Sequence, residues 1–386
     1  MKVLALTEGP NHVCYRYRIE AFASALAERD WTLESLPLEP NTFGRSGQLR
    51  AASSADVVIL QRKLLPLWQL RILRRAARVL VYDFDDALFH RDSYSRKGPL
   101  SWARLAHFWA TIYAADAITA GNTYLQDQAA AYVDPSRVHL MPTCVDPALY
   151  PLADHSRVDR DVKLVWIGQH STLAGLYFAQ EALAAAGDAL PGLELRVICN
   201  RFPQLEGVHV VPRQWSQAGE ATEVAAADIG ISWLPDDSWS PGKCGLKVLQ
   251  YMAAGLPVVA NPVGMNKEMV IHGETGFLAT TPEEWTAAVT RLAASPELRN
   301  KLGAAGRKLV EKNFSVNRWA PEFAALIDGL PRQVMLPARS AGESETAELE
   351  APSPDKKLRS KPRTASAPTP ALDAALLPSS LTERVN

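Results

Sequence analysis

Cysteine is scarce in this sequence, and its residues are far apart. The 386 residues include four cysteines, none of which belongs to a CxxC pair: Cys14, Cys144, Cys199 and Cys244. This spacing argues against a zinc knot and against a disulfide framework. It fits a protein of the reducing cytosol, where thiols stay free.

The sequence also lacks an excess of charge of either sign and lacks a long apolar run. Its 41 basic residues stand against 42 acidic ones, which argues against a nucleic-acid partner held by a basic field. No uncharged apolar stretch reaches the roughly 18 residues of a membrane-spanning helix, and the N-terminal run is too short for a signal peptide. We expect a cytoplasmic protein, soluble or peripheral on the inner face of a membrane.

The length and the alternation of patterns predict the organisation of the chain. A chain of 386 residues exceeds what one hydrophobic core usually serves. Buried-strand patterns alternate with helical ones up to about residue 330, which predicts an α/β protein. We therefore predict domains at 1–150 and 151–330. Residues 331–386 are rich in Ala, Ser and Pro, and we expect them to be a disordered tail with a basic cluster at 356–363.

One segment, residues 241–260, organises the prediction of a site. It reads PGKCGLKVLQYMAAGLPVVA, which predicts a helix at about Cys244 to Ala254 and then a buried strand. Lys243, Lys247 and Gln250 fall on one helical face. A helix start with two ammonium groups is a receptor for a diphosphate, and Gln250 is placed to reach a sugar hydroxyl. The alternative is the solvated face of an ordinary amphipathic helix.

The predicted strand ends of the N-terminal half supply further candidates. Lys2 to Thr7 reads as a buried strand, and the loop with Gly9 follows it. Ligands of open α/β sheets bind at such carboxyl ends, so Gly9, Arg16 and Arg18 are candidates for a site. The two arginines alternatively decorate the start of a helix through residues 21–28.

The sequence DFDD gives a second group of candidates. Val79 to Phe84 reads as a strand that delivers Asp83, Asp85 and Asp86 at its end. Carboxylates in this position bind a divalent metal or act as a base. They alternatively cap the segment that follows.

The apolar residues of two other segments in this half also predict their structure. Residues 61–80 have the composition of a basic amphipathic helix that lies on an anionic membrane. An ordinary crossover helix packed on the sheet is the favoured alternative. Residues 101–114 are helical and aromatic-rich, and we expect Trp102, Phe108, Trp109 and Tyr113 to fill the core.

The C-terminal half resembles a known family in several motifs that come in the same order. These are QYMA at 250–253, GLPVVA at 255–260, PVG at 262–264 and GETGFL at 273–278. They resemble the family 4, or group 1, glycosyltransferases, and the resemblance extends over about residues 1–330. It implies a GT-B fold, with two Rossmann-like domains facing across a cleft. It also implies retaining transfer from a nucleotide-sugar donor, with no metal and no other cofactor.

The resemblance assigns roles to several residues and also shows departures. Asp85 and Asp86 would lie nearest the reacting sugar, and Glu268 matches a glutamate of the family. The paired glutamates of the E-x7-E motif are replaced by Gly242 and Gln250, which marks a subgroup with a GKCGxKxLQYMA segment.

A further departure follows the strand at residues 163–168. Here the family places an arginine and a lysine soon after the glycine, whereas this chain has Gly168, Gln169 and His170. We keep Gly168 and Gln169 as donor-binding candidates and expect Lys243 and Lys247 to supply the missing charge. His170 is a candidate base, although a loop histidine bonded to backbone is the favoured alternative.

The predicted function is sugar transfer to a glycan, lipid-linked or protein acceptor in bacterial polysaccharide or glycoconjugate assembly. Two alternatives stay open. A non-catalytic GT-B subunit that binds a glycan or a partner enzyme would explain the missing glutamate. A nucleotide-sugar epimerase is less favoured, because the DFDD and GKCG segments resemble those of transferases.

Overall fold

The computed structural model describes residues 1–330 apart from 10–11 and 157–160. The predicted tail at 331–386, with its basic cluster, lies outside the described residues. Within the described part the chain forms two parallel sheets of six strands each.

The first sheet is built from strands whose residues are mostly buried and apolar, the pattern of a parallel sheet covered on both faces. Its strands are β1 (Lys2–Thr7), β2 (Thr32–Pro37), β3 (Val57–Gln61), β4 (Val79–Phe84), β5 (Ala117–Ala120) and β6 (Val138–Leu140). Their order is β2-β1-β3-β4-β5-β6, and every neighbouring pair is parallel. The order reverses between β1 and β3, so a crevice at their carboxyl ends is the expected ligand position.

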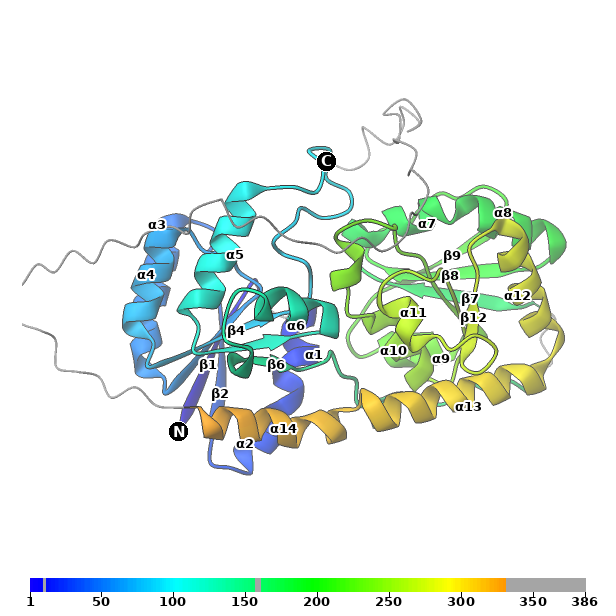
Figure 1. Ribbon diagram of the computed structural model, residues 1–386. Helices are drawn as coiled ribbons and strands as arrows, with labels where there is room; N and C mark the ends of the chain where they lie inside the picture. The colour runs from blue at the N-terminus through cyan, green and yellow to red at the C-terminus, as the bar shows by residue number, and fades with distance from the viewer. Residues whose placement is uncertain (10–11, 157–160, 331–386) are drawn as a thin grey trace, which may run out of the picture. The chain divides into compact units, whose positions relative to one another are not determined.

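Six helices connect these strands, together with short 3₁₀ turns. They are α1 (Val13–Arg18), α2 (Ala23–Ala27), α3 (Thr42–Ala51), α4 (Leu67–Ala76), α5 (Trp102–Ala114) and α6 (Thr123–Ala130). Helices α4 and α5 pack beside each other on one face of the sheet (Figure 1). Their apolar faces, with Leu70 and Leu73 from α4 and Phe108 and Ile112 from α5, belong to one core cluster.

The second sheet has the strand order of a classical dinucleotide-binding fold. Its strands are β7 (Lys163–Ile167), β8 (Glu194–Cys199), β9 (His209–Gln214), β10 (Ile229–Ser232), β11 (Val258–Ala260) and β12 (Gly276–Leu278). The order β12-β11-β10-β7-β8-β9 reverses between β7 and β10. A second candidate crevice therefore lies at the carboxyl ends of these two strands.

The second half contains eight helices up to residue 329. They are α7 (Ala174–Phe178), α8 (Gln180–Ala189), α9 (Glu220–Ala225), α10 (Leu246–Ala253), α11 (Met265–Met269), α12 (Pro282–Ala294), α13 (Pro296–Asn313) and α14 (Val316–Gly329). Helix α13 packs closely on α10. A Cβ atom at Gly303 would lie 1.8 Å from the carbonyl oxygen of Gly255, so this crossing requires glycine.

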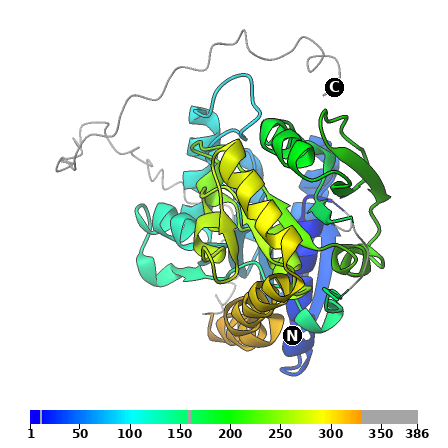
Figure 2. The same ribbon diagram turned by 90° about the vertical axis from the view of Figure 1, so that its right-hand side faces the viewer.

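Helix α14 packs against the first half of the chain. The rings of Phe22 and Phe323 lie 4.9 Å apart between centroids, and Trp31 Nε1 donates a hydrogen bond to Asp328. Figures 1 and 2 both show α14, in orange, next to the dark-blue N-terminal segments. The last helix therefore covers the first sheet rather than the second.

In the first half, the favoured prediction of a crossover helix within residues 61–80 is confirmed, the less favoured alternative of one long helix is not, and one core assignment is wrong. Residues 61–80 are not one amphipathic helix, because β3 ends at Gln61, α4 begins at Leu67 and β4 begins at Val79. The apolar stripe of α4 packs on the sheet, as the favoured alternative predicted. Of the four aromatic residues expected to fill the core, Trp102 and Tyr113 are exposed instead.

None of the helices within the described residues is both long enough and apolar enough to cross a membrane.

Candidate functional site

Three strands of the first sheet bring charged side chains together at its carboxyl edge. Glu8 follows β1, Arg62 follows β3, and Asp85 and Asp86 follow β4. Arg62 lies at the centre of the group. Its guanidinium pairs with Asp85, with Asp86 at 2.7 Å and with Glu8 at 3.3 Å. The reversal of strand order between β1 and β3 therefore contains a built charge cluster.

The backbone of Arg62 has an unusual conformation. Its φ is +58°, in the left-handed region, and Asp30 is the other non-glycine residue with positive φ in the described part of the chain. Such a conformation is uncommon for a long side chain and persists where surrounding contacts hold it. Here the backbone N–H of Arg62 also donates to the carbonyl of Asp83. Arg62 is thus fixed at both ends.

The charge state of Asp85 follows from these contacts. Burial raises the pKa of Asp85, but the nearby Arg62 and Arg18 outweigh it and lower the pKa to about 2. The carboxylate is therefore ionised at neutral pH and is a weak base. Its arrangement suits charge stabilisation better than proton abstraction.

The two arginines of α1 make their contacts inside the protein. Arg18 is fully buried, donates two hydrogen bonds to the carboxylate of Asp83 and donates one to the carbonyl of Met141. Arg16 pairs with Glu220 of α9 at 2.6 Å. In this structure both guanidinium groups connect protein segments. Arg18 could contact a ligand only if the segments that bury its side chain moved apart. Gly9, at the end of β1, has open space around it.

Lys243 lies before α10 rather than within it. The helix begins at Leu246, later than predicted, because Gly245 adopts a left-handed φ of +67° at its N-cap. The ammonium of Lys243 lies 3.2 Å from Asp86 and 5.6 Å from the ring centroid of Trp239. Lys243 therefore joins the charge cluster of the first sheet to the segment before α10.

Lys247 lies in the first turn of α10 and points toward the second sheet. Its ammonium lies 4.8 Å from the ring centroid of Trp166, at the end of β7. Burial lowers the pKa of Lys247 to about 7, and repulsion from Lys243 adds to the effect. Among the described residues no carboxylate lies within 4.0 Å of this ammonium. Lys247 is thus a sheltered cation at the β7/β10 crevice without a protein counter-ion.

Gln250 does not face an open space. It is buried, and its side-chain amide donates to the hydroxyls of Tyr17 and Tyr150 at 3.1 and 3.2 Å. Tyr17 in turn donates to Glu220 at 2.6 Å. This buried polar network connects α1, α9 and α10. A contact between Gln250 and a sugar hydroxyl would require the network to rearrange.

The remaining predicted residues lie at two places on the second half. Gly168 and Gln169 follow β7, and a Cβ atom at Gly168 would lie within 3 Å of the Trp166 ring. Glu268 lies exposed on α11, while its neighbour Asn266 is buried and bonded to Ser232. The predicted candidates of the second half are therefore spread along the sheet edge, with Lys247 near Gly168.

Gly242 lies in close contact with the first sheet's loop. A Cβ atom at Gly242 would lie 2.4 Å from the backbone nitrogen of Ala87. Asn122 donates to the carbonyls of Pro241 and Lys243, and the thiol of Cys244 contacts the carbonyl of Asp85. We call residues 240–245 the docking loop. In this structure the loop packs directly on the end of β4 and on the start of α6.

The sequence pattern missed some of the residues that organise this site. The sequence pattern assigns Arg62 to the basic segment 61–80 and Glu8 to the candidate loop after the first strand, and it gives Tyr17, Tyr150 and Glu220 no role. An arginine directly after the buried strand VVILQ was the available signal for Arg62. The partners of Tyr17 come from distant segments, and no local pattern indicates them.

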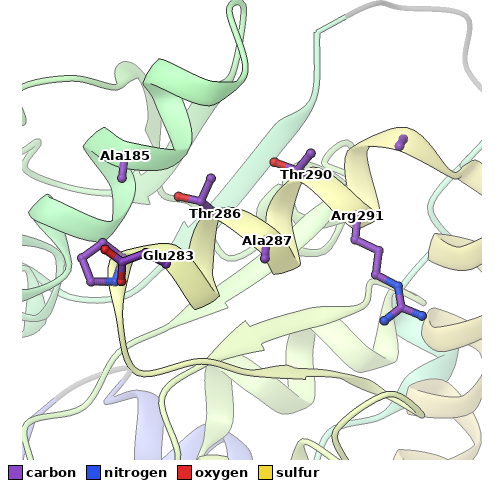
Figure 3. A pocket seen from close by; sticks show the side chains of 8 residues that line it. Ala185, Glu283, Thr286, Ala287, Thr290 and Arg291 are labelled. Atoms are coloured by element: carbon purple, nitrogen blue, oxygen red, sulfur yellow. The ribbon is translucent and has the colours of Figure 1, made fainter.

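A hollow on the surface lies elsewhere on the molecule (Figure 3). It runs between α8 and α12, and its polar lining comes from Glu283, Thr286, Thr290 and Arg291. None of the predicted site residues lines it. The charge pattern at the sheet edges, rather than this hollow, therefore guides the functional interpretation.

Comparison with known proteins gives a family match for part of the chain. Residues 232–309, which include the docking loop and α10, match the family model of glycosyl transferases group 1. Trehalose synthase of Pyrococcus horikoshii is 33% identical over 86 residues, which are 22% of this chain and 21% of that protein. A lipopolysaccharide core biosynthesis mannosyltransferase, LpsB of Rhizobium meliloti, is 38% identical over 93 residues, which are 23% and 26% of the two chains. The matched segments thus cover only about a quarter of the length of each of these relatives.

Solved structures match nearly the whole described chain. Sucrose-phosphate synthase of Thermosynechococcus elongatus has a TM-score of 0.66 at 18% identity and covers 85% of this chain and 98% of its own. HepE of Anabaena, solved with UDP and glucose, has a TM-score of 0.60 at 16% identity, with 86% and 100% covered. The predicted α/β fold of GT-B type, with two Rossmann-like domains, is confirmed. The boundaries at residues 150 and 330 stay predictions.

Proposed function

We propose that this chain is a glycosyltransferase of group 1 that transfers a sugar from a nucleotide-sugar to an acceptor. The donor would lie at the β7/β10 crevice, with its diphosphate at Lys247 and the start of α10. The acceptor would lie on the side of the first sheet, near Asp85 and Asp86. The match of residues 232–309 to the glycosyltransferase model supports the assignment of sugar transfer.

The observation that carries the proposal is the environment of Lys247. The ammonium of Lys247 lies beside Trp166 and has no carboxylate partner among the described residues. Burial lowers the pKa of this ammonium to about 7. A diphosphate would supply the missing counter-charge and favour the protonated amine. In the transition state the same ammonium would offset the charge that develops on the leaving nucleoside diphosphate.

We further propose the finer features that the resemblance to family 4 implies. Transfer would be retaining, with neither metal nor other cofactor, in the assembly of a bacterial polysaccharide or glycoconjugate. Asp85, ionised through its contact with Arg62, would face the reacting sugar as a fixed negative charge. The protein would act in the cytoplasm, at the inner face of the membrane where its acceptor requires it.

A thermal-shift panel tests the donor site. The panel contains UDP, GDP, dTDP and ADP, and the proteins are the wild type and the double variant Lys243→Ala/Lys247→Ala. A ligand at 100 times its dissociation constant stabilises the folded state by about 2.7 kcal/mol. We expect one nucleotide to stabilise the wild type and not the double variant.

The matched control is Lys301→Ala/Lys308→Ala, which removes two exposed lysines of α13. This control should keep the full nucleotide response. If no nucleotide stabilises the well-folded wild type, the proposal of a donor site is wrong.

A second function, a non-catalytic GT-B subunit, is favoured by the docking loop. Gly242, which replaces the first family glutamate, packs on Ala87, and Gln250 is engaged with Tyr17 and Tyr150. Both positions of the family's carboxylate pair are thus used for contacts between segments. On this account nucleotide-sugars would neither bind nor react, and the protein would act through a partner. Affinity purification of the full chain, with a glycosyltransferase recovered beside it, would support this function.

A further inference from the structure

The loop after β4 is closed on itself. The backbone N–H of Arg91 donates to the carbonyl of Pro99 at 2.8 Å, which joins the two ends of the loop. The guanidinium of Arg91 also donates to the carbonyls of Lys97 and Gly98. A loop with bonded ends and its own side chain packed inside it is compact. Residues 91–100 are therefore a compact extension of the first half.

Tyr94 brings this loop into contact with the second half. Its ring stacks on the ring of Phe178, the last residue of α7, with the centroids 6.4 Å apart and the planes at 14°. A Cβ atom at Gly175 of α7 would lie 3.8 Å from the Tyr94 hydroxyl oxygen, an ordinary contact distance. Within the described residues this hydroxyl has no hydrogen-bond partner. The Tyr94 hydroxyl thus lies beside α7, the helix that follows β7.

Asp237 belongs to the segment that follows β10 in the second half. Its Oδ1 atom accepts hydrogen bonds from the backbone N–H groups of Trp239 at 3.0 Å and Ser240 at 2.9 Å. Its second oxygen, Oδ2, accepts no hydrogen bond within the part of the chain that the structure describes. One oxygen of this carboxylate therefore holds the start of the docking loop, and the other is available to a ligand.

The carboxylate of Asp237 acts on two side chains of the first half. Burial and the Asp237 charge raise the pKa of Tyr94 to about 12, so this hydroxyl keeps its proton at neutral pH. Burial lowers the pKa of His90, and the Asp237 charge offsets part of this lowering. The imidazole of His90 is therefore neutral at pH 7, with one nitrogen that donates and one that accepts. We call Asp237, His90 and Tyr94 the bridging group.

The bridging group adjoins the contact between the docking loop and the first half. The backbone N–H of His90 donates to the carbonyl of Ala87, the residue on which Gly242 packs. Asp237 follows β10, and Tyr94 lies beside α7, which follows β7. The bridging group therefore connects the loop after β4 with the ends of both strands of the β7/β10 crevice.

We propose that the bridging group binds hydroxyl groups of the sugar in the nucleotide-sugar donor. This inference rests on the proposed function, because it requires a donor at the β7/β10 crevice. The Oδ2 atom of Asp237 accepts a hydrogen bond from one sugar hydroxyl. His90 and Tyr94 contribute further donors and acceptors from the side of the first half. The sugar is thus held by both halves of the molecule.

The departures from the family motif leave this role unfilled elsewhere. Gly242, in place of the first glutamate, has no side chain that could accept a hydrogen bond. Gln250, in place of the second, donates to the hydroxyls of Tyr17 and Tyr150. A carboxylate is the stronger acceptor for a sugar hydroxyl, since hydrogen bonds to charged groups exceed neutral ones in strength. Asp237 supplies that carboxylate next to the docking loop.

Calorimetric titration of paired ligands tests the proposal with the full-length protein. Each pair is a nucleotide and its sugar conjugate: UDP with UDP-glucose and UDP-N-acetylglucosamine, GDP with GDP-mannose, dTDP with dTDP-glucose, and ADP with ADP-glucose. The nucleotide measures the diphosphate site alone, whereas the conjugate measures that site together with the bridging group. We expect the wild type to bind one nucleotide and at least one of its conjugates.

The variant Asp237→Asn keeps an oxygen for the two backbone N–H groups of the docking loop but loses the charged acceptor. We expect it to bind the conjugate about tenfold more weakly and the nucleotide as tightly as the wild type does. Tyr94→Phe keeps the stacking on Phe178 and removes the hydroxyl. It should weaken conjugate binding about fivefold and leave nucleotide binding unchanged.

The matched controls are Asp188→Asn, at an exposed aspartate near the end of α8, and Tyr132→Phe, at an exposed tyrosine of the first half. Both should bind the two ligands as the wild type does. An equal loss of nucleotide and conjugate binding in Asp237→Asn would overturn the proposal, because it would show a structural role in the docking loop. Conjugate binding that neither Asp237→Asn nor Tyr94→Phe weakens would overturn it as well.

The paired ligands also separate this inference from the proposed function. Nucleotide binding without binding of any conjugate would reject the bridging group and keep the diphosphate site at Lys247. The same conclusion follows if the conjugate binds equally to the wild type and to both variants of the bridging group. Absence of binding by every nucleotide and conjugate, in a well-folded wild type, would reject both the donor site and the bridging group.

Discussion

Lys247 is the residue whose environment connects the fold to the proposed chemistry. Its pKa is lowered from the ordinary value of 10.5 to about 7 in the folded protein. The unfolded chain therefore binds more protons than the folded one between about pH 7 and pH 10.5, and stability rises with pH in this window. Below about pH 7 the cost of holding the charge in this half-buried position is present in full.

The variant Lys247→Met tests this environment through stability. Since methionine removes the half-buried charge but keeps much of the volume, the variant should unfold at higher denaturant than the wild type at pH 6. We expect a gain of roughly 2 kcal/mol after allowing for the remaining solvent contact, since one pKa unit corresponds to about 1.4 kcal/mol. The gain should shrink as the pH rises toward 10.

Urea unfolding at several pH values measures the gain. Lys308→Met, a change of an exposed lysine of α13, is the control and should show little pH dependence of its effect. A Lys247→Met variant that is less stable than the wild type at every pH would contradict the assigned environment.

Arg62 is the second residue with a large predicted effect. Its replacement by methionine would leave the carboxylates of Glu8, Asp85 and Asp86 without their shared cation. Breaking a buried ion pair from one side costs about 3 to 5 kcal/mol. We therefore expect Arg62→Met to be strongly destabilised at neutral pH in urea unfolding, with the exposed Arg71→Met as control.

Acid titration gives this prediction a specific signature. The folded pKa of Asp85 is lowered to about 2 from the ordinary 3.8, so its ion pairs stabilise the wild type above about pH 3.8. That contribution is lost as the pH falls toward 2. In Arg62→Met the main attraction is gone, so the destabilisation should diminish in acid. An equal loss at pH 7 and at about pH 3 would contradict the electrostatic account.

The sequence predicted single residues less well than elements. Trp102 was expected in the core, yet it is the first residue of α5, one turn before the face that packs on the sheet. The position of Arg62 directly after a strand predicts its place at the sheet edge, but its three partners were missed, because they come from the loops after β1 and β4. Such long-range contacts are set by topology and leave no trace in local spacing.

At the scale of elements, the docking loop carries a steric constraint that a single substitution can test. The variant Gly242→Ala would place a methyl group 2.4 Å from the backbone nitrogen of Ala87. Since backbone cannot give way as a flexible side chain does, the loop or the end of β4 would have to shift. We expect a loss of about 1 to 3 kcal/mol in the free energy of unfolding.

Gly47→Ala in α3 is the matched control, since a Cβ atom at Gly47 has no neighbour within 4 Å. That change should be neutral or slightly stabilising, because alanine favours a helix. Equal effects of the two substitutions would show that the docking loop is not packed on Ala87 in solution.

Two elements are predicted with accurate ends. The strands Lys2–Thr7 and Val79–Phe84 are predicted with the bounds that the structure shows. Both are mostly apolar runs that the structure buries. Helix α10 begins two residues later than predicted, because the left-handed Gly245 is compatible with either a turn or a cap. A glycine in sequence does not specify its φ.

At the scale of the whole molecule, the two halves carry complementary parts of the proposed site. The first contributes the Arg62 cluster, and the second contributes Lys247 and the docking loop, which meet at the pair between Asp86 and Lys243. In this pair Asp86 already neutralises Lys243, which is one of the two lysines expected to bind the diphosphate. The fold follows from the order of strand and helix patterns, whereas the pairing of the halves depends on contacts far apart in sequence.

The pair between Asp86 and Lys243 therefore competes with the donor. Asp86→Asn should release Lys243 and strengthen binding of the nucleotide identified in the thermal-shift panel by up to about fivefold, since a partly exposed ion pair contributes up to about 1 kcal/mol. Calorimetric titration measures the change. In the double variant Asp86→Asn/Lys243→Met the gain should vanish, and a gain that persists there would assign it to another cause.

Proton uptake during nucleotide binding is the most direct test of the central claim that Lys247 receives the diphosphate. The nucleotide from the panel is titrated into the wild type at about pH 8 in two buffers of different ionisation enthalpy, where most Lys247 side chains are neutral. The account predicts uptake of up to about one proton per nucleotide bound, and none in Lys247→Met. Binding without proton uptake, or with equal uptake in the two proteins, would contradict it.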